Sequence, residues 1–395
     1  MEFYISRKMK DMKPSAIREF FKYASVPGVI SYSAGSPSPE ALPVEAIREI
    51  TSRIVEEDVE KALLYSVSEG YTPLREELRK YVADNYSSTT DDDDILILSG
   101  ATQSVDLAAK VLCDEGDTVI CEDPSFTGCL NTFRTYGVNL AGVPVSETGI
   151  DLNRLERALK EEKRVRLIYT IPNFQNPTGY TMDLPTRRGL YELAVRYNVP
   201  ILEDDPYGDL RFEGEALPTI KSMDKEGLVL YNRTFSKVLS AGIRVGYFIV
   251  PKALMGMLTV GKQSTDVHTG MISQLLCYRF LAGYDLTAHI KAIAPVYKRK
   301  CGLMLSELGR LPGDKITFSR PEGGLFVWAT LPGITDASEF VMRLVMEKKV
   351  ATVPGGGFFA RQPHVSNCLR MTFAAPSDEQ IVTGIGLMGE LLKEY

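Results

Sequence analysis

The feature that most limits the fold of this 395-residue chain is an alternation of short apolar runs with longer amphipathic stretches, which begins near residue 95. The runs are rich in β-branched residues and fall at 95–98, 118–121, 165–169, 199–202, 228–231 and 244–250. Stretches with helical periodicity separate them, such as 155–160 and 187–197. Apolar strands that alternate with helices indicate a mostly parallel sheet covered by helices on both faces. We therefore predict an α/β fold.

The pattern changes after about residue 285. A helical pattern covers 297–308, a Pro-Gly break follows at 312–313, and a strand near 325–328 precedes a helix at 337–347. This order is typical of a smaller α+β domain. At about 100 to 200 residues per domain, the length also suggests two domains.

The first 40 residues contain one expected helix, at 15–23, and a segment rich in Gly, Pro and Ser at 33–39. They are too few for a domain of their own. We predict three parts: an N-terminal arm that belongs to the small domain (1–40), a large domain (41–285) and a small C-terminal domain (286–395).

Charge and cysteine usage exclude several functions. The 45 Lys+Arg and 51 Asp+Glu residues give a net charge of −6, which argues against general binding to nucleic acid or anionic membranes. The chain shows no export signal and no 18-residue apolar stretch, so we expect no membrane association. Six scattered cysteines without a Cys-x-x-Cys pair predict free thiols in the cytoplasm. The three histidines are too widely separated in the sequence to indicate a metal site. We interpret the acidic run 91–94 as a solvated turn rather than a metal site.

Small polar residues follow the first apolar run, at 99–104, and open a helix. In an open parallel sheet, ligands bind at the carboxyl ends of the strands. The free N–H groups and positive dipole end of such a helix suit a phosphate. Taken alone, such residues before a helix are more often an ordinary helix cap.

Three later runs also end in polar segments. Residues 172–179 follow one strand, and the carboxylates of 203–205 follow the next, where burial is costly unless a positive group is near. After the run at 228–231, Lys237 lies among small hydroxyl residues, with Arg244 seven positions later. This pair supplies an amine nucleophile and a bidentate anion ligand. Taken singly, each segment also fits a polar surface loop.

Taken together and in this order, the segments resemble the class I/II aminotransferases, which are fold type I enzymes dependent on pyridoxal 5′-phosphate (PLP). The resemblance covers nearly the whole chain and rests on four motifs: Asn-Pro-Thr-Gly at 176–179, Asp-x-x-Tyr at 204–207, Ser-Lys at 236–237 with Arg244, and Cys-Leu-Arg-Met-Thr-Phe at 368–373. It implies a large domain with a mostly parallel, seven-stranded sheet and a small α+β domain. It also implies transfer of an amino group from an L-amino acid to a 2-oxo acid.

The resemblance assigns roles to four residues around the cofactor ring. Lys237 is implied to form the internal aldimine and then to move the proton between the substrate Cα and the cofactor. Asp204 is implied to keep the pyridine nitrogen protonated, so that the ring accepts electrons. Asn176 and Tyr207 are implied to hydrogen-bond the phenolate oxygen.

Further residues are implied to hold the rest of the cofactor. The phosphate ligands are Arg244, Thr234, Ser236 and the backbone of Ala101 and Thr102. Phe126 is implied to stack on the ring, and a core phenylalanine is the alternative. Tyr65 matches a tyrosine that reaches the phosphate in the neighbouring subunit, which implies a homodimer with shared active sites. The family more often has serine at position 234 and Ser-x-x at 101–103, so one hydroxyl contact to the phosphate is in doubt.

Arg370 is implied to bind the substrate α-carboxylate through a planar fork, with Asn176, Tyr65 and the mobile-arm residue Gly35 also on the substrate side. The N-terminal segments 12–19 and 29–37 look like the branch that contains 2-aminoadipate, kynurenine and multi-substrate aromatic or branched-chain aminotransferases. Arg18 matches an arginine that contacts the distal carboxylate there, and an exposed helix arginine is the alternative. The resemblance also implies 2-oxoglutarate as the usual acceptor.

Two other functions were weighed. A PLP-dependent carbon–sulfur β-lyase uses the same scaffold, and the cofactor motifs alone do not separate it from an aminotransferase. A transcriptional regulator with this domain needs a DNA-binding segment ahead of it, and the first 40 residues contain no basic recognition helix. We therefore expect an enzyme, with the aminotransferase as the first reading and the lyase as the alternative.

Overall fold

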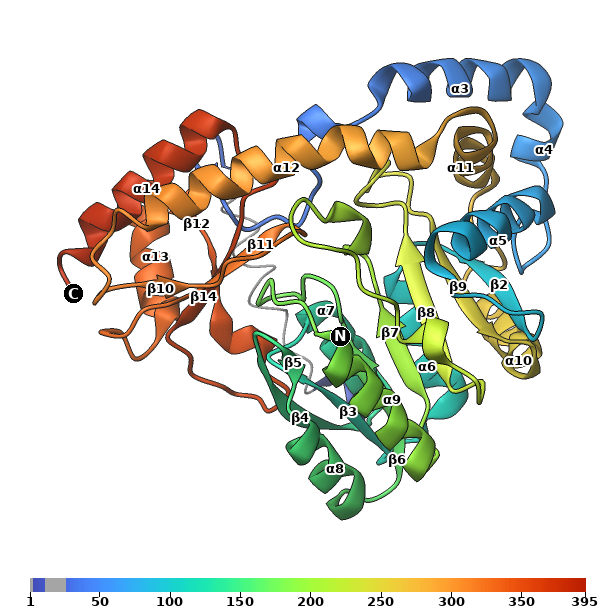
Figure 1. The fold of residues 1–395 in the computed structure, drawn as a ribbon, viewed down its shortest axis with the longest axis horizontal. Helices are drawn as coiled ribbons and strands as arrows, with labels where there is room; N and C mark the ends of the chain where they lie inside the picture. Colours follow the sequence, from blue (N-terminus) through green and yellow to red (C-terminus); the bar gives the residue numbers. More distant parts are fainter. Residues whose placement is uncertain (1–2, 11–25) are drawn as a thin grey trace.

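The computed structural model describes residues 3–10 and 26–395. Its largest sheet has eight strands in the order β2-β9-β8-β7-β6-β3-β4-β5 (Figure 1). In chain order the strands are β2 (Asp93–Leu98), β3 (Thr118–Asp123), β4 (Asn139–Ser146), β5 (Gly149–Ile150), β6 (Val165–Thr170), β7 (Ile201–Asp204), β8 (Val229–Thr234) and β9 (Gly246–Pro251).

All six apolar runs of the sequence form strands of this sheet, which is mostly parallel as predicted. The strands β8, β7, β6, β3 and β4 are parallel to one another, whereas β9 is antiparallel to both β8 and β2. The predicted count of seven strands was one short, because the two-residue β5 adds an antiparallel edge to β4. Strand β4 was not predicted from the sequence, because its mostly exposed or half-buried residues form no continuous apolar run.

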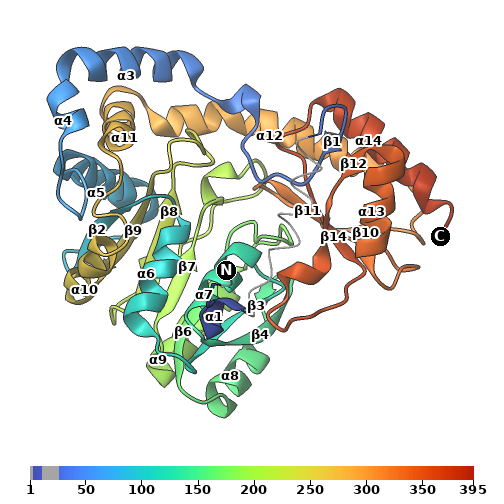
Figure 2. The ribbon, with the colours of Figure 1, turned by 180° about the vertical axis from the view of Figure 1, so that it is seen from behind.

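Helices cover both faces of the sheet. Helices α8 and α9 lie on the face seen in Figure 1, and α6 and α7 lie on the face seen in Figure 2. Among the described residues up to 283, the helices are α1 (Arg7–Lys10), α3 (Val44–Glu57), α4 (Val59–Leu63), α5 (Thr72–Tyr86), α6 (Thr102–Leu112), α7 (Thr127–Thr135), α8 (Leu152–Glu161), α9 (Leu184–Tyr197), α10 (Lys252–Gln263) and α11 (Met271–Gly283), with short 3-10 turns η1 (Pro39–Ala41), η2 (Gly208–Leu210) and η3 (Lys221–Met223). No helix of the described residues has the length and apolar character needed to cross a membrane.

Local sequence explains where these helices begin. The Asp151 side chain accepts a hydrogen bond from the Arg154 N–H and caps α8, and Asp183 caps α9 in the same way. Leu155 and Leu159, four residues apart on one side of α8, are buried in the same apolar cluster as residues of the sheet. The caps and the apolar stripe together fix both the start and the orientation of each helix.

The C-terminal part forms a second layered unit beside the large sheet (Figure 1). Its sheet has the order β10-β11-β14-β13, and the N-terminal β1 pairs in parallel with β12. Its elements are α12 (Leu286–Leu308), β10 (Thr317–Phe318), β11 (Phe326–Thr330), α13 (Ala337–Lys348), β12 (Val350–Ala351), β13 (Val353–Pro354), η4 (Gly355–Phe358), β14 (Cys368–Thr372) and α14 (Asp378–Leu392), with β1 at Ile30–Ser31. The pairing of β1 with β12 joins the two ends of the chain. The division at residues 40 and 285 remains a prediction.

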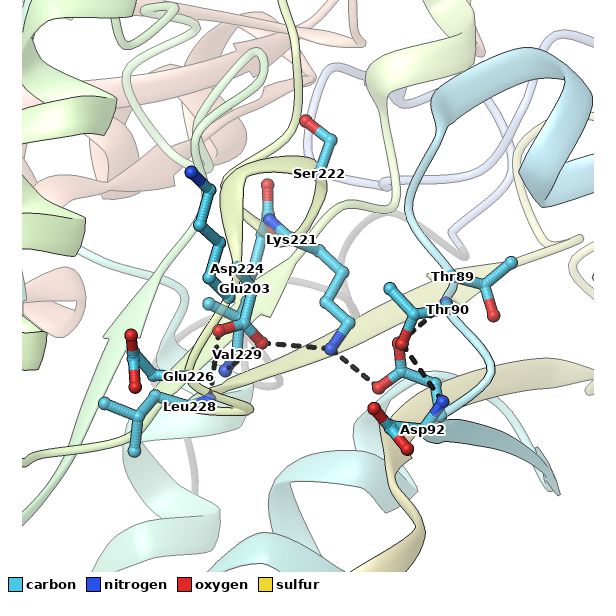
Figure 3. A network of polar contacts seen from close by, with 12 residues as sticks. Thr89, Thr90, Asp92, Glu203, Lys221, Ser222, Asp224, Glu226, Leu228 and Val229 are labelled. Atoms are coloured by element: carbon cyan, nitrogen blue, oxygen red, sulfur yellow. Dashed lines mark hydrogen bonds and ion pairs between the residues drawn. The ribbon is translucent and has the colours of Figure 1, made fainter.

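A buried ion network ties the start of β2 to the segment before β8. The Lys221 Nζ atom lies 2.8 Å from Asp93 and 3.0 Å from Asp224, and all three side chains are at most 3% exposed. Figure 3 shows Lys221 between Asp224 and the turn that carries Thr90 and Asp92. The prediction of a solvated acidic turn is thus wrong for Asp93, which is buried because it pairs with a lysine distant in sequence.

We predict that Lys221→Met lowers the free energy of unfolding by about 3–5 kcal/mol, because it leaves the buried Asp93 and Asp224 carboxylates without a cation. Urea denaturation of the full chain measures the loss. The control is Lys80→Met, which removes an exposed pair with Glu77 and should cost less than about 1 kcal/mol. Equal losses in the two variants would contradict the importance of the buried pair.

Candidate active site

The polar segments predicted at the strand ends meet at one edge of the large sheet. β6, β7 and β8 are adjacent and parallel, so their carboxyl ends lie side by side. Asp204 is the last residue of β7, Asn176 follows β6 and Lys237 follows β8. The topology therefore brings together residues that are up to 61 positions apart, from Asn176 to Lys237.

Asp204 is buried between two hydrogen-bond donors from the flanking strands. The Tyr169 hydroxyl on β6 donates to one carboxylate oxygen at 2.8 Å, and the Asn232 amide on β8 donates to the other at 2.7 Å. Burial raises the pKa of Asp204 to about 6, although both donors oppose the rise. The carboxylate is thus held in one orientation at the edge of the sheet.

Lys237 is a half-buried amine near two arginines, Arg244 and Arg370. Its Nζ donates a hydrogen bond to the Gly35 carbonyl at 2.7 Å. Burial, helped by the nearby Arg244 and Arg370 cations, lowers the pKa of Lys237 to about 8, against the opposing effect of Asp204. A lowered pKa leaves more of the amine neutral near pH 7, which is the form that attacks a carbonyl carbon.

Arg370 on β14 lies in the same neighbourhood. Its guanidinium donates to the Asn176 side-chain oxygen at 3.0 Å and to the Ser33 carbonyl at 2.7 Å, and it lies 4.2 Å from the centre of the Phe326 ring. The buried Nε atom has no hydrogen-bond partner, and no ion pair to Arg370 is found in the described part of the chain. Burial lowers the pKa of Arg370 to about 10, with Tyr207 acting against it. A buried cation with a free donor is suited to an anionic ligand.

Asn176 links Arg370 to Tyr207. Its side-chain oxygen accepts from Arg370, and its amide nitrogen donates to the Tyr207 hydroxyl over a long 3.4 Å. The ring of Tyr207 meets Phe326 edge-on at 5.8 Å, and burial raises the pKa of its phenol. Three of the residues predicted for one site are therefore joined by contacts.

A turn at the start of α6 forms the other end of the site. Gly100 has a φ of +90°, and a Cβ on it would lie 2.0 Å from the Arg244 guanidinium, so the arginine lies directly on this turn. Ala101 and Thr102 come next and open α6. The sequence prediction placed Arg244 in a strand, but its φ is +53° and β9 begins only at Gly246.

Two hydroxyl residues lie at the end of β8, close to this turn. The Ser236 N–H donates to the Thr234 hydroxyl oxygen at 3.1 Å, and the two hydroxyl oxygens are 2.8 Å apart. Thr234 also contacts the Val245 carbonyl at 3.1 Å. Both side chains are buried, so their hydroxyls have few competing contacts with solvent.

Two predicted residues, Tyr65 and Phe126, make no hydrogen bond to this group among the described residues. Tyr65 is 90% exposed, and its ring contacts His268 edge-on. Phe126 precedes α7, and its ring lies close against Gly128. Arg18 lies outside the described residues.

The sequence analysis missed the residues that support the predicted ones. Tyr169 was taken only as the end of an apolar run, Asn232 falls just past the run at 228–231, and Ser33 and Phe326 were not singled out. The signal for Tyr169 and Asn232 was their place at the carboxyl ends of the two strands beside Asp204. Using it requires the strand order, which the sequence does not state.

A sequence profile described as aminotransferase class I and II matches residues 28–386. The chain belongs to this family. It is 38% identical to aromatic-amino-acid aminotransferase 1 of Thermococcus litoralis, over all of this chain and 95% of the relative. It is 37% identical to 2-aminoadipate transaminase of Thermus thermophilus, over 97% of this chain and 94% of the relative.

The fold agrees with the family. A crystal structure of Pyrococcus horikoshii kynurenine aminotransferase, in complex with pyridoxamine phosphate and kynurenine, superposes with a TM-score of 0.94 at 37% identity and covers 99% of this chain and 97% of that one. This aminotransferase is thus a PLP-dependent enzyme of fold type I that transfers amino groups. The family, the enzyme class, the cofactor and the fold class predicted from sequence are confirmed.

The residues at the sheet edge fit this cofactor. Lys237 offers an amine with a lowered pKa for the aldehyde, and Asp204 offers a buried, oriented carboxylate for a ring nitrogen. The turn before α6 and Arg244 offer backbone N–H groups and a guanidinium for a phosphate. The unpartnered Nε of Arg370 remains free for a substrate carboxylate.

We predict that Asp204→Asn stabilises the cofactor-free protein at pH 8. The pKa of Asp204 is raised from 3.8 to about 6 on folding, so ionisation destabilises the folded state by up to about 3 kcal/mol above pH 6, and this penalty disappears below the unfolded pKa. Urea denaturation at pH 8 and pH 5 measures the effect, which should be larger at pH 8.

The matched control is Asp84→Asn at an exposed position of α5, which should change the free energy of unfolding little at either pH. An advantage of Asp204→Asn that is equal at the two pH values would show that the carboxylate is not destabilised by its burial.

Proposed function

We propose that this aminotransferase moves the amino group of an L-amino acid of the 2-aminoadipate, aromatic or branched-chain type to a 2-oxo acid, with 2-oxoglutarate as the usual acceptor. The observation that carries this proposal is the group formed by Lys237, Asp204 and Arg370, in which a half-buried amine lies near a buried carboxylate and a buried guanidinium without an ion-pair partner among the described residues. The printed names of relatives, which include aromatic-amino-acid, 2-aminoadipate and kynurenine/α-aminoadipate aminotransferases, support the substrate classes.

The bound cofactor supplies a ring that accepts electrons from the substrate Cα–H bond. In the proposed mechanism, Lys237 would hold the cofactor through its amine. Once freed by the substrate, the same amine would take the proton from the substrate Cα and deliver it to the cofactor. Asp204 stabilises a protonated ring nitrogen. Asn176 and Tyr207 donate hydrogen bonds to the ring oxygen. Lys237, Asp204 and Tyr207 are therefore the proposed catalytic residues.

The remaining cofactor contacts are proposed for the turn before α6 and for β8. Arg244, the Thr234 and Ser236 hydroxyls and the backbone N–H groups of Ala101 and Thr102 hold the phosphate. Phe126 stacks on the ring. The positive end of α6 favours the phosphate charge, as in other helix N-termini that bind anions.

The substrate is proposed to bind between the N-terminal segment and β14. Arg370 binds the α-carboxylate by a two-bond fork, and Asn176, already within 3.0 Å of Arg370, orients it. Orientation of the Cα–H bond toward the ring then supplies part of the rate enhancement. Gly35 borders Lys237 through its carbonyl, and Arg18 is proposed to bind a distal carboxylate.

We also propose a homodimer with shared active sites. Six apolar or aromatic side chains of the segment 55–67 are between 45% and 90% exposed: Val55, Val59, Leu63, Leu64, Tyr65 and Val67. Exposed apolar side chains gathered in one segment are typical of an interaction surface. Tyr65 lies in this segment and is proposed to reach the phosphate of the partner subunit.

We also propose a cytoplasmic location. All six cysteines are free thiols, which supports it.

A panel of amino donors with 2-oxoglutarate tests the substrate proposal. We expect glutamate formation with 2-aminoadipate, aromatic or branched-chain donors, and no pyruvate or ammonia from cysteine conjugates without an acceptor. Pyruvate formed without an acceptor would favour the lyase.

Kinetics of an Arg18→Ala variant test the proposed contact with the distal carboxylate. We expect this variant to raise the KM for 2-aminoadipate and 2-oxoglutarate but not for leucine, because only the dicarboxylates lose a charge pair. An unchanged KM for the dicarboxylates would exclude Arg18 from the site.

Mixed dimers test the shared site. We expect Lys237→Ala to lose turnover and the visible absorption of the bound cofactor, and Tyr65→Ala to weaken cofactor binding. Subunits of the two variants, unfolded together and refolded, should regain activity, because each mixed dimer contains one site with both native residues. The control is each variant refolded alone. No recovery in mixtures that form mixed dimers would contradict the role of Tyr65 across the interface.

A further inference from the structure

The proposed mechanism gives no role to Lys262, a fully buried cation. Lys262, near the end of α10, is 0% exposed. Its Nζ lies 3.0 Å and 3.1 Å from the two carboxylate oxygens of Asp266, 2.9 Å from the Gln103 side-chain oxygen and 3.1 Å from the Thr269 hydroxyl. A buried ammonium requires such partners, because its desolvation is costly.

The same ion pair reaches both sides of the turn before α6. The Asp266 carboxylate accepts from the Ser99 hydroxyl at 2.5 Å and from the Gln103 amide at 3.0 Å. The Gln103 side-chain oxygen accepts in turn from the Ser99 N–H at 2.8 Å. Ser99 precedes Gly100, and Gln103 lies in the first turn of α6. The network therefore holds the residues immediately before and after Gly100–Thr102.

This turn lacks the usual means of fixing a helix start. Most helix N-termini are fixed by a Ser, Thr, Asp or Asn side chain at the cap position. Here the cap residue is Ala101, and α6 has no side-chain cap hydrogen bond. Gly100 adds a flexible backbone position with a φ of +90°. The hydrogen bonds of Ser99 and Gln103 to the ion pair supply the constraint that Ala101 cannot.

We propose that Lys262 and Asp266 are positioning residues for the cofactor phosphate. They fix Ser99 and Gln103 so that the N–H groups of the turn point to one place. An anion site made of backbone N–H groups depends on their preorganised direction. This inference rests on the proposed phosphate site and adds to it two residues that do not touch the phosphate.

The test compares PLP with pyridoxal, which lacks the phosphate. The full-length apoproteins of Lys262→Met and Asp266→Asn are equilibrated with each compound, and the free compound is measured after ultrafiltration. We expect the Kd for PLP to rise about tenfold, the effect of one or two hydrogen bonds, and the Kd for pyridoxal to stay within about twofold. At saturating PLP, kcat should stay within about twofold of the wild type.

Two controls separate positioning from general damage. Lys110→Met removes a partly exposed lysine that also contacts this region, at Thr265, and should leave both Kd values unchanged. The double variant Lys262→Met/Asp266→Asn leaves no unpaired charge, so it should fold where a single variant fails and still bind PLP more weakly. The inference is overturned if PLP affinity is within twofold of the wild type, or if PLP and pyridoxal weaken equally.

An Arg244→Met variant distinguishes the failure of this inference from that of the phosphate site. If Arg244→Met weakens PLP selectively but the Lys262 and Asp266 variants do not, only the positioning role is wrong. If Arg244→Met also fails to discriminate PLP from pyridoxal, the proposed phosphate site itself is wrong.

Discussion

Burial of charge at the carboxyl edge of the large sheet is the constraint on which the rest of the site depends. Asp204 and Arg370 are buried and Lys237 is half-buried, in a region where a charged group is stable only with donors, acceptors or opposite charges around it. Burial moves the pKa of Asp204 up to about 6 and that of Lys237 down to about 8. The same desolvation thus moves the pKa values of an acid and of a base closer to neutral pH.

The groups that satisfy these charges come from distant parts of the chain. Tyr169 and Asn232 reach Asp204 from neighbouring strands, while Gly35 and Ser33 reach Lys237 and Arg370 from the N-terminal segment. The pairing of β1 with β12 holds that segment against the C-terminal part. The site is therefore assembled from the large sheet and from both ends of the chain.

Two further buried lysines act away from the reacting groups. Lys221 joins the start of β2 to the segment before β8, and Lys262 joins α10 to the start of α6. Each pairs with an aspartate, so each ion pair fixes two elements relative to each other. Such a buried pair fixes the relative positions of two elements more than it adds to net stability. The cost of removing both charges from water offsets much of the attraction between them.

The sequence by itself determined the family and the fold class, and it predicted the groups that are proposed to carry the chemistry. Lys237, Asp204, Asn176 and Arg244 could be predicted because each lies in a short motif that resembles the class I/II aminotransferases. The strands could be found because buried parallel strands are continuous apolar runs, and the edge strand β4 was missed because it is not. Only the tertiary structure decided which groups support the motifs. Tyr169, Asn232, Lys262 and the burial of Asp93 depend on strand order and on contacts between residues far apart in the chain, and local patterns do not record these.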